Sequence, residues 1–415
     1  MDQANGFVNR RLVPALTAVS ENTYMSAIRA GMVSVVPLTI IGGLFMVVSF
    51  LPVPGWEQIV EPFLSLLEIP VTATFGLLAV FVCFAIGYDL GKRFNQEAVV
   101  SAGMATLIFL MIQIRREDQT LGMDGLGSQG LFTAILIALI TVRVQKLFSD
   151  LNVVIKLPPN VPPIVYESFV SLTPMCFLVV VFWLVRFVAG VDINQVVQHT
   201  LAPLLFALNT LPGILVYAFL VTMLWSVGIN GDNAMDAIVA PIFLQFLATN
   251  VEAMTQGQPL PSITAYGFFT TFVNVGGTGA TLALALIMLN SKEPGFRKVS
   301  RVSLPTQIFQ INEPIFFGFP IVLNPIFMVP YVLNALMLTT GTYLLMSWGL
   351  IQRPFVNLPW TTPPIIGHYL VTGGDWRASV WGVISIGLAM LVYYPFAKAA
   401  ERQRLRAEAE GKAHE

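Results

Sequence analysis

Long apolar runs separated by short polar loops dominate the sequence. A helix that crosses the hydrocarbon core of a bilayer needs about 20 apolar residues. Nine blocks approach or exceed that length: residues 31–51, 71–90, 98–114, 129–141, 166–188, 208–227, 266–290, 325–350 and 379–397. The pattern predicts an all-α, polytopic membrane protein. The first block begins too far from the N-terminus to be a cleaved signal peptide.

Two stretches in the C-terminal half break this pattern. One begins at Trp225 and continues to Asn250, and the other runs from Gln307 to Pro325. Both mix Gly, Pro and polar residues with apolar ones. Irregular backbone at membrane depth is tolerated only where it lines a cavity or is buried in protein, and paired interrupted segments are typical of a transporter's substrate site. We therefore expect both stretches to be re-entrant and to face a ligand.

A third polar stretch, rich in glycine, runs from Thr270 to Thr281. It lacks the lysine and the spacing of a phosphate-binding loop, and no nucleotide-binding strand precedes it. Close packing of helices through small residues is the favoured interpretation of this stretch. Contact with a ligand is the alternative.

The polar side chains of the two interrupted stretches suit an uncharged, polyhydroxylated ligand. Amide and carboxylate groups bind pairs of hydroxyls, and aromatic rings cover the apolar face of a sugar. The polar candidates are Asn230, Asp232, Asn233, Asn312, Glu313 and Asn324, and the aromatic candidates are Trp225, Phe316, Phe317 and Trp360.

Glu313 is the strongest of these candidates. A carboxylate within a membrane segment is energetically costly, and apolar residues surround this one on both sides, so a functional role is expected. The alternative is an acid that caps a helix at the membrane surface.

Composition excludes several classes of protein. Only 11% of the residues are charged and 55% are hydrophobic, whereas soluble domains carry about 25% charged residues. The net charge of −1 offers no basic field for nucleic acid. Both cysteines, Cys83 and Cys176, lie in apolar runs and are expected to be buried, and the three histidines lack the spacing of metal ligands. We therefore expect neither a metal nor a cofactor.

Basic residues predict the orientation in the membrane. They cluster in the N-terminal tail and in residues 92–93, 143–156, 292–301 and 398–412, whereas residues 52–70 hold three glutamates and no Lys or Arg. Because cytoplasmic loops are enriched in Lys and Arg, both termini are expected in the cytoplasm. Residues 1–30 are predicted to form an interfacial segment, and residues 398–415 a charged cytoplasmic tail.

Several motifs together resemble one family. They are IKLPPNVPP from Ile155, WSVGING from Trp225, NEPIFFGFPIVLNP from Asn312, PWTTPP from Pro359 and GGDWR from Gly373. The chain resembles, over nearly its whole length, the membrane-spanning enzyme IIC component of the phosphoenolpyruvate-dependent sugar phosphotransferase system. The similarity is to the lactose and cellobiose (diacetylchitobiose) family.

The resemblance implies a fold and an activity. The fold would have about ten transmembrane helices and two re-entrant hairpins, in a homodimer within the bacterial cell membrane and its lipid. Residues 31–190 would form the scaffold and dimerisation half, and residues 191–397 the substrate-binding half. The protein would move a disaccharide inward while a separate phosphorylated enzyme IIB phosphorylates the sugar's 6-hydroxyl. As the membrane subunit of that phosphotransferase, it would be an enzyme component.

The resemblance also implies residue roles. Glu313 matches the family carboxylate that hydrogen-bonds the hydroxyl to be phosphorylated, and Asn312 and Trp360 match neighbouring sugar contacts. The family usually has His where this chain has Asn230. Asn can hydrogen-bond a hydroxyl but does not titrate near neutral pH. Base character would then rest on Glu313 or on Asp232.

Two other classes of function remain open from the sequence. A proton-coupled secondary sugar transporter would use Glu313 or Asp232 as a proton carrier and would do no chemistry. A membrane sensor or scaffold would show no sugar flux. The sequence does not select among cellobiose, diacetylchitobiose and lactose, because these ligands differ only in hydroxyl orientation or an N-acetyl group.

Overall fold

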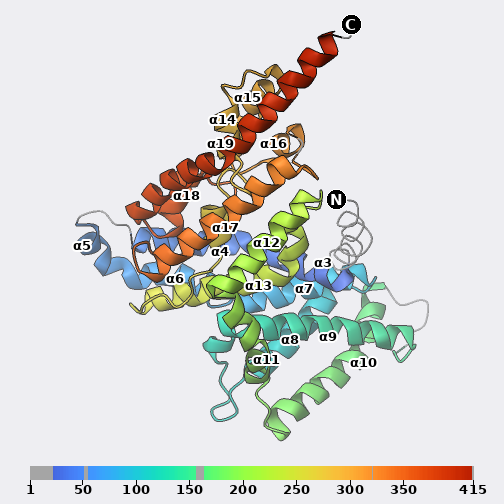
Figure 1. The fold of residues 1–415 in the computed structure, drawn as a ribbon. Helices are drawn as coiled ribbons and strands as arrows, with labels where there is room; N and C mark the ends of the chain where they lie inside the picture. Colours follow the sequence, from blue (N-terminus) through green and yellow to red (C-terminus); the bar gives the residue numbers. More distant parts are fainter. Residues whose placement is uncertain (1–21, 51–54, 156–162, 320, 414–415) are drawn as a thin grey trace.

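A computed structural model describes residues 22–50, 55–155, 163–319 and 321–413, and this part of the chain is almost entirely helical (Figure 1). An isolated bridge between Ile114 and Leu121 is the one strand-like pairing within these residues. The all-α fold expected from the sequence is therefore confirmed. Most of the expected interfacial segment (residues 1–21) and most of the motif after Ile155 (residues 156–162) lie outside the described residues.

The described residues of the N-terminal half form eight α-helices. They are α3 (Thr23–Ser34), α4 (Val36–Ser49), α5 (Trp56–Val60), α6 (Leu64–Thr74), α7 (Leu78–Arg93), α8 (Ala98–Gln113), α9 (Leu131–Asp150) and α10 (Pro163–Trp183). Helix α7 lies at the centre and packs against α3, α8 and α9. Gly87 of α7 faces α8, where a Cβ atom would lie 3.0 Å from the Cα of Ala102. Small residues thus let these two helices approach closely, as in many membrane proteins.

The C-terminal half contains the remaining helices. They are α11 (Ile193–Leu208), α12 (Leu211–Ser226), α13 (Gly231–Thr255), α14 (Leu282–Met288), α15 (Pro294–Ile308), α16 (Glu313–Gly318), α17 (Pro325–Ser347), α18 (Pro364–Val371) and α19 (Trp376–Ala413). Helix α17 packs against α12 and α19, and α18 also packs against α19. The end of α19 projects beyond the rest of the molecule, with α14 and α15 beside it (Figure 1).

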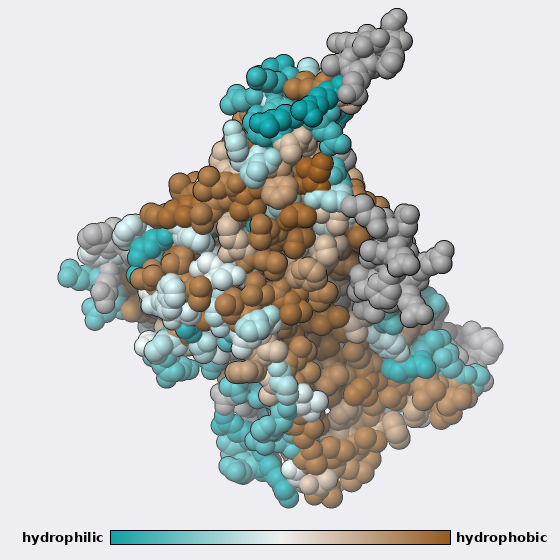
Figure 2. All heavy atoms as spheres, in the orientation of Figure 1, coloured by the Kyte–Doolittle hydropathy of each residue, from teal (hydrophilic) through white to brown (hydrophobic). Residues whose placement is uncertain are grey.

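Seven helical segments of the described residues are long and apolar enough to cross a membrane, or eight if the bent α11–α12 pair is one span. That pair bends by 78° at residues 209–210. Apolar side chains cover the broad middle of the surface, whereas hydrophilic ones gather over α15 and the projecting part of α19 (Figure 2). This distribution suits a multi-pass membrane protein with an apolar middle in lipid and a hydrophilic part, around α15 and α19, in water. Cys83 is buried as expected, but the expectation for Cys176 is wrong, because it lies exposed on α10.

One expected span is broken in the structure. Residues 266–290 form a π-helix (Phe268–Val273), a glycine-rich loop and the short helix α14. Gly276, Gly277 and Gly279 all have positive φ angles, which favour glycine and interrupt a helix. Nearly every residue from Phe268 to Ala285 is buried. Irregular backbone is thus kept away from lipid by the surrounding protein.

The stretch from Trp225 to Asn250 is more regular than expected. A short turn follows Trp225, and α13 then runs for 25 residues without interruption. The side-chain oxygen of Asn230 accepts a hydrogen bond of 2.9 Å from the backbone N–H of Asn233 and so caps this helix. The polar residues that suggested a break are therefore the beginning of a helix.

Candidate functional site

A cavity of about 560 Å³ lies where α3, α4 and α13 meet two irregular segments, the glycine-rich loop after the π-helix and the residues before α16. Five residues proposed from the sequence as site residues line it: Asn230, Asp232, Asn312, Glu313 and Trp360. They come from three segments that are far apart in the sequence. Asn233 and Trp225, two further candidates from the sequence, also line the cavity, and the roles of all these residues toward a ligand remain predictions.

Asp232 is held in place by three donors. Its Oδ2 atom accepts hydrogen bonds from the indole Nε1 of Trp225 (2.8 Å) and from the hydroxyl of Thr278 (2.6 Å). Its Oδ1 atom accepts a longer one from the amide of Asn274 (3.5 Å). Donors to a carboxylate stabilise its charged form and fix its orientation. Asp232 therefore joins α13 to the glycine-rich loop as a fixed part of the cavity wall.

The glycine-rich loop is also anchored to the segment before α16. The side-chain oxygen of Gln310 accepts hydrogen bonds from the backbone N–H groups of Gly276 (2.6 Å) and Gly277 (3.1 Å). The amide of Asn312 donates to the carbonyl oxygen of Thr278 (3.0 Å). Gln310 and Asn312 are both buried. The two irregular segments are therefore one hydrogen-bonded unit.

Close approach at Gly277 explains the need for glycine there. A Cβ atom at this position would lie 2.4 Å from the Cβ of Asn312, and its φ angle is +102°. Both facts exclude other residues without rearrangement. The loop expected to serve helix packing thus also lines the cavity, since Gly277 and Thr278 belong to its wall.

Glu313 differs from Asp232 because its carboxylate is not engaged. It is the first residue of α16 and is exposed. Within the described part of the chain, no hydrogen bond or ion pair involves its side chain. The capping alternative therefore finds no support, since no backbone N–H of α16 is capped by a side chain. Glu313 therefore lines the cavity with a carboxylate that is free to accept hydrogen bonds.

The aromatic residues behave differently from one another. Trp225 and Trp360 line the cavity, and Trp360 is 55% exposed. Phe316 is buried and packs edge-on against Trp225, with ring centroids 5.1 Å apart. Phe316 and Phe317 are not cavity residues. Asn324 is also absent from the wall, because its side chain caps α17.

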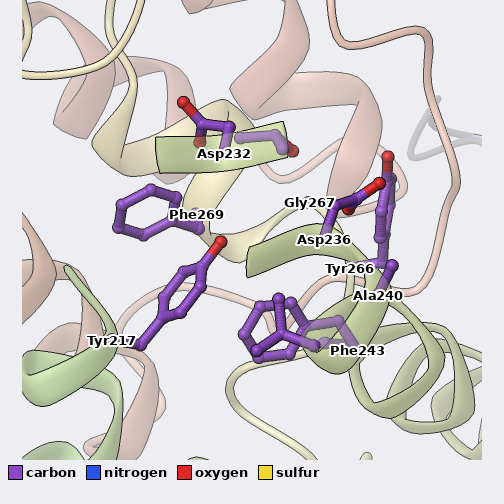
Figure 3. A pocket seen from close by; sticks show the side chains of 11 residues that line it. Tyr217, Asp232, Asp236, Ala240, Phe243, Tyr266, Gly267 and Phe269 are labelled. Atoms are coloured by element: carbon purple, nitrogen blue, oxygen red, sulfur yellow. The ribbon is translucent and has the colours of Figure 1, made fainter. Parts of the chain in front are cut away.

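Sequence reasoning missed Asp236 and Tyr266, which also line the cavity, as does Thr270 at the start of the third polar stretch. Asp236 follows Asp232 by one helical turn, so a continuous helix from residue 231 would have placed both on one face. The two aspartates also border a smaller adjoining cavity of about 60 Å³. Figure 3 shows the carboxylate of Asp236 directed toward Tyr266, with Tyr217 on the opposite wall.

No histidine is among the cavity-lining residues of the described chain. His368 is buried on α18, with its ring 4.5 Å from that of Phe272 and a hydrogen bond between its Nδ1 and the carbonyl of Pro364. His368 therefore has a structural place outside the site. The acidic side chains that line the cavity are Asp232, Asp236 and Glu313.

Comparison with known proteins gives consistent matches. The family model described as "Phosphotransferase system, EIIC" matches residues 29–335. The chain is 34% identical to the putative permease IIC component YwbA of Bacillus subtilis, over 97% of this chain and 96% of that protein. It is 33% identical to the cellobiose-specific EIIC component of Geobacillus stearothermophilus, over 98% and 96% of the two chains.

A solved structure is also similar. The chain superposes on the crystal structure of ChbC, the IIC component from the N,N'-diacetylchitobiose-specific phosphotransferase system, with a TM-score of 0.91 and 32% sequence identity. The match covers 97% of this chain and 99% of the other. Similarity of this extent includes every segment that builds the cavity.

Proposed function

This chain belongs to the EIIC family of the phosphotransferase system, and from that membership we propose that it imports a disaccharide of the cellobiose, diacetylchitobiose or lactose type. The sugar binds in the cavity and moves inward. A separate phosphorylated EIIB protein then phosphorylates its 6-hydroxyl. The protein acts as the membrane subunit of this phosphotransferase.

One observation carries the proposal: a cavity of about 560 Å³ holds a fixed carboxylate and an open one among amides and tryptophans. Its volume lies within the range of small-molecule sites, about 300–1,000 Å³. Asp232, Asn312 and Asn230 offer acceptors and donors for sugar hydroxyls. Trp225 and Trp360 provide apolar faces for the rings. This is the chemistry that an uncharged disaccharide requires.

Glu313 is the proposed base. A hydroxyl becomes a better nucleophile as a neighbouring carboxylate accepts its proton, which contributes about 10²–10⁴-fold to a rate. The Glu313 carboxylate is free to do so, whereas the oxygens of Asp232 are already engaged by Trp225, Thr278 and Asn274. Asp232 therefore orients the sugar, and Glu313 receives the proton.

The phosphoryl donor is proposed to be another polypeptide. In the resembled family the phosphoryl carrier is a cysteine of the enzyme IIB domain. Here Cys83 is fully buried in the N-terminal half, and Cys176 lies on α10. Neither cysteine lines the cavity. Neither is placed to carry the phosphoryl group to the sugar.

The decisive experiment is uptake of radiolabelled disaccharides into proteoliposomes, with and without phosphorylated EIIB inside. The proposal expects accumulation of sugar 6-phosphate, and only when the donor is present. Accumulation of unmodified sugar driven by a proton gradient would replace the proposal with secondary transport. No flux of any sugar in the panel would place the protein outside transport.

Glu313→Gln tests the base directly. The variant keeps the size of the side chain but cannot accept a proton, so phosphorylation should fall by at least about 100-fold. Glu252→Gln is the matched control, because Glu252 is exposed on α13 away from the cavity. Near-normal phosphorylation by Glu313→Gln would remove this residue from the chemistry.

A further inference from the structure

Arg29 lies beside the candidate site and has no role in it so far. The sequence alone assigned this residue to the N-terminal tail, but it is on α3 within the first candidate span, residues 23–49. Val33, one helical turn further along α3, lines the cavity. Residues four apart share one face of a helix. Arg29 is therefore on the cavity side of α3, one turn closer to its N-terminal end.

Two nitrogens of the partly buried Arg29 guanidinium have no hydrogen-bond partner within the described residues. Its Nε and Nη2 atoms are inaccessible to solvent, and within the described residues neither makes a hydrogen bond. A charged group in a membrane protein that lacks such bonds costs several kcal/mol. Charged residues within membrane segments often mark the path of a substrate or an ion.

Asp236 is a negative charge that acts on Arg29. Helices α3 and α13 pack against each other, and the Asp236 carboxylate lies within electrostatic range of the guanidinium. Asp236 lines the sugar cavity. Arg29 thus lies across a helix interface from the site, with donor atoms that Asp236 does not occupy.

We propose that Arg29 binds the phosphoryl group while it passes from the donor protein to the sugar. This inference rests on the proposed function and adds the group that neutralises the anion. The planar guanidinium presents paired N–H donors that match phosphate oxygens. Phosphoryl transfer depends largely on such charge stabilisation. The N-terminal end of α3 is also the side expected to face the cytoplasm, from which the donor approaches.

The step balances without a further reactant. The 6-hydroxyl oxygen of the sugar attacks phosphorus and forms the new P–O bond. The bond between phosphorus and the cysteine sulfur of the donor breaks, and its electron pair leaves on the thiolate. Glu313 takes the hydroxyl proton. Arg29 holds the non-bridging phosphoryl oxygens throughout, and nothing is oxidised or reduced.

The test separates sugar binding from transfer. Wild type, Arg29→Gln and Arg29→Lys are compared in two assays: equilibrium sugar binding without donor, and transfer of phosphate from phosphorylated EIIB. We expect Arg29→Gln to lower the transfer rate by about 100-fold or more and to leave the sugar Kd within about threefold. Arg29→Lys keeps the positive charge but loses the paired N–H donors of the guanidinium. Its transfer rate should lie between those of wild type and Arg29→Gln.

Arg186→Gln is the matched control. Arg186 is another arginine in an apolar segment, but its Nη1 pairs with Asp192 at 3.0 Å away from the cavity. Its variant should transfer phosphate at close to the wild-type rate. Equal transfer by Arg29→Gln and wild type would overturn the inference. Loss of donor-dependent phosphorylation in wild type would instead overturn the proposed function itself.

A second variant tests whether Arg29 serves only as the counterion of Asp236. If it does, Asp236→Asn combined with Arg29→Gln should restore transfer, because no unpaired charge remains. If Arg29 binds the phosphoryl group, the double variant should stay as slow in transfer as Arg29→Gln. Restoration would refute the phosphoryl role, and so would a sugar Kd that rises in parallel with the loss of transfer.

Discussion

At the scale of single residues, the side chains of the site divide into those that build it and those left open to a ligand. Asn230 belongs to the first group because its oxygen caps α13. Asp232 and Asn312 also make bonds within the protein. Asn233, Glu313 and Trp360 are the exposed ones. Recognition of sugar would therefore depend on a rigid frame with three accessible polar or aromatic side chains.

Asn230→His restores the residue usual in the resembled family. Histidine is a poor N-cap, so the variant should lose about 1 kcal/mol of stability. Sugar affinity should change little if the position only hydrogen-bonds a hydroxyl. Thermal unfolding in detergent and sugar titration on the same samples check both expectations. A variant that fails to fold would show that the cap outweighs any contact with sugar.

Gly277→Ala should damage the site through the backbone. The new Cβ would lie 2.4 Å from that of Asn312, at a φ angle of +102°. Relief requires Asn312 to move and to lose its bond to Thr278. Overpacking of this kind costs about 1–3 kcal/mol, and sugar affinity should fall at least tenfold.

Gly103→Ala is the control for Gly277→Ala, because a Cβ on Gly103 meets no atom within 4 Å. Its unfolding temperature and sugar affinity should remain near those of wild type. If the two variants behave alike, the close approach at Gly277 does not constrain the site.

At the scale of elements, hydrophobic pattern predicted the regular spans but not the broken one. Helices α9 and α17 correspond to apolar blocks of the sequence. Residues 266–290 are equally apolar, yet the structure breaks them into a π-helix, a loop and α14. A hydropathy pattern shows only that residues avoid water. Residues buried inside the protein therefore give the same pattern as residues that face lipid. The partners of the loop, Gln310 and Asn312, come from a later segment and are invisible to local pattern.

Residues of the candidate site could be predicted from the sequence where their side-chain type itself indicates a function. An acid beside an amide in an apolar stretch identified Glu313 and Asn312. Asp236 was missed because the polar residues after Trp225 suggested a break rather than the first turns of a helix. Val33 and Val36 of the cavity wall carry no chemical signal at all. The place of Val33 follows only from how α3 packs on α13.

The contact between α19 and the loop after α14 gives an element-scale prediction. Glu401 accepts hydrogen bonds from the hydroxyl of Ser291 (2.7 Å), from the backbone N–H of Lys292 and from Lys398 (2.7 Å). Glu401→Ala removes these acceptors, so the amides of residues 290–297 should exchange with solvent faster, by at least about tenfold.

Hydrogen–deuterium exchange measures this effect, with Gln403→Ala as an exposed control on the same helix. Sugar affinity should be retained in both variants because Glu401 is not part of the cavity. Unchanged exchange in Glu401→Ala would mean that α19 does not hold the loop in place.

At the scale of the whole molecule, we expect a homodimer formed through the N-terminal half. One face of α10 is exposed and apolar, with Leu172, Val180 and Trp183 between 43% and 53% accessible. Exposed apolar surface of this kind is covered by lipid or by a second protein. Light scattering of the detergent-purified protein should give twice the chain mass of 45.4 kDa. A mass that stays at one chain at all concentrations would contradict the dimer.

Cys176 allows the face itself to be tested, because it lies on that side of α10 between Leu172 and Val180 and is exposed. A bifunctional maleimide should link two copies in membranes, and Cys176→Ser should abolish the link. Cys83 is fully buried and serves as an internal control. A dimer by mass without this link would place the contact elsewhere on the surface.

The two halves meet at the site rather than beside it. The side-chain amide of Asn357 donates to the hydroxyl of Thr39 on α4, at 2.5 Å. Val33 and Val36 complete a wall whose polar members come from α13, from residues 266–278 and from residues 310–313. If sugar binds in this cavity, sugar preference is shared by the two halves. Recombination within this family would then have to transfer α3 and α4 together with the C-terminal half to carry that preference into a relative.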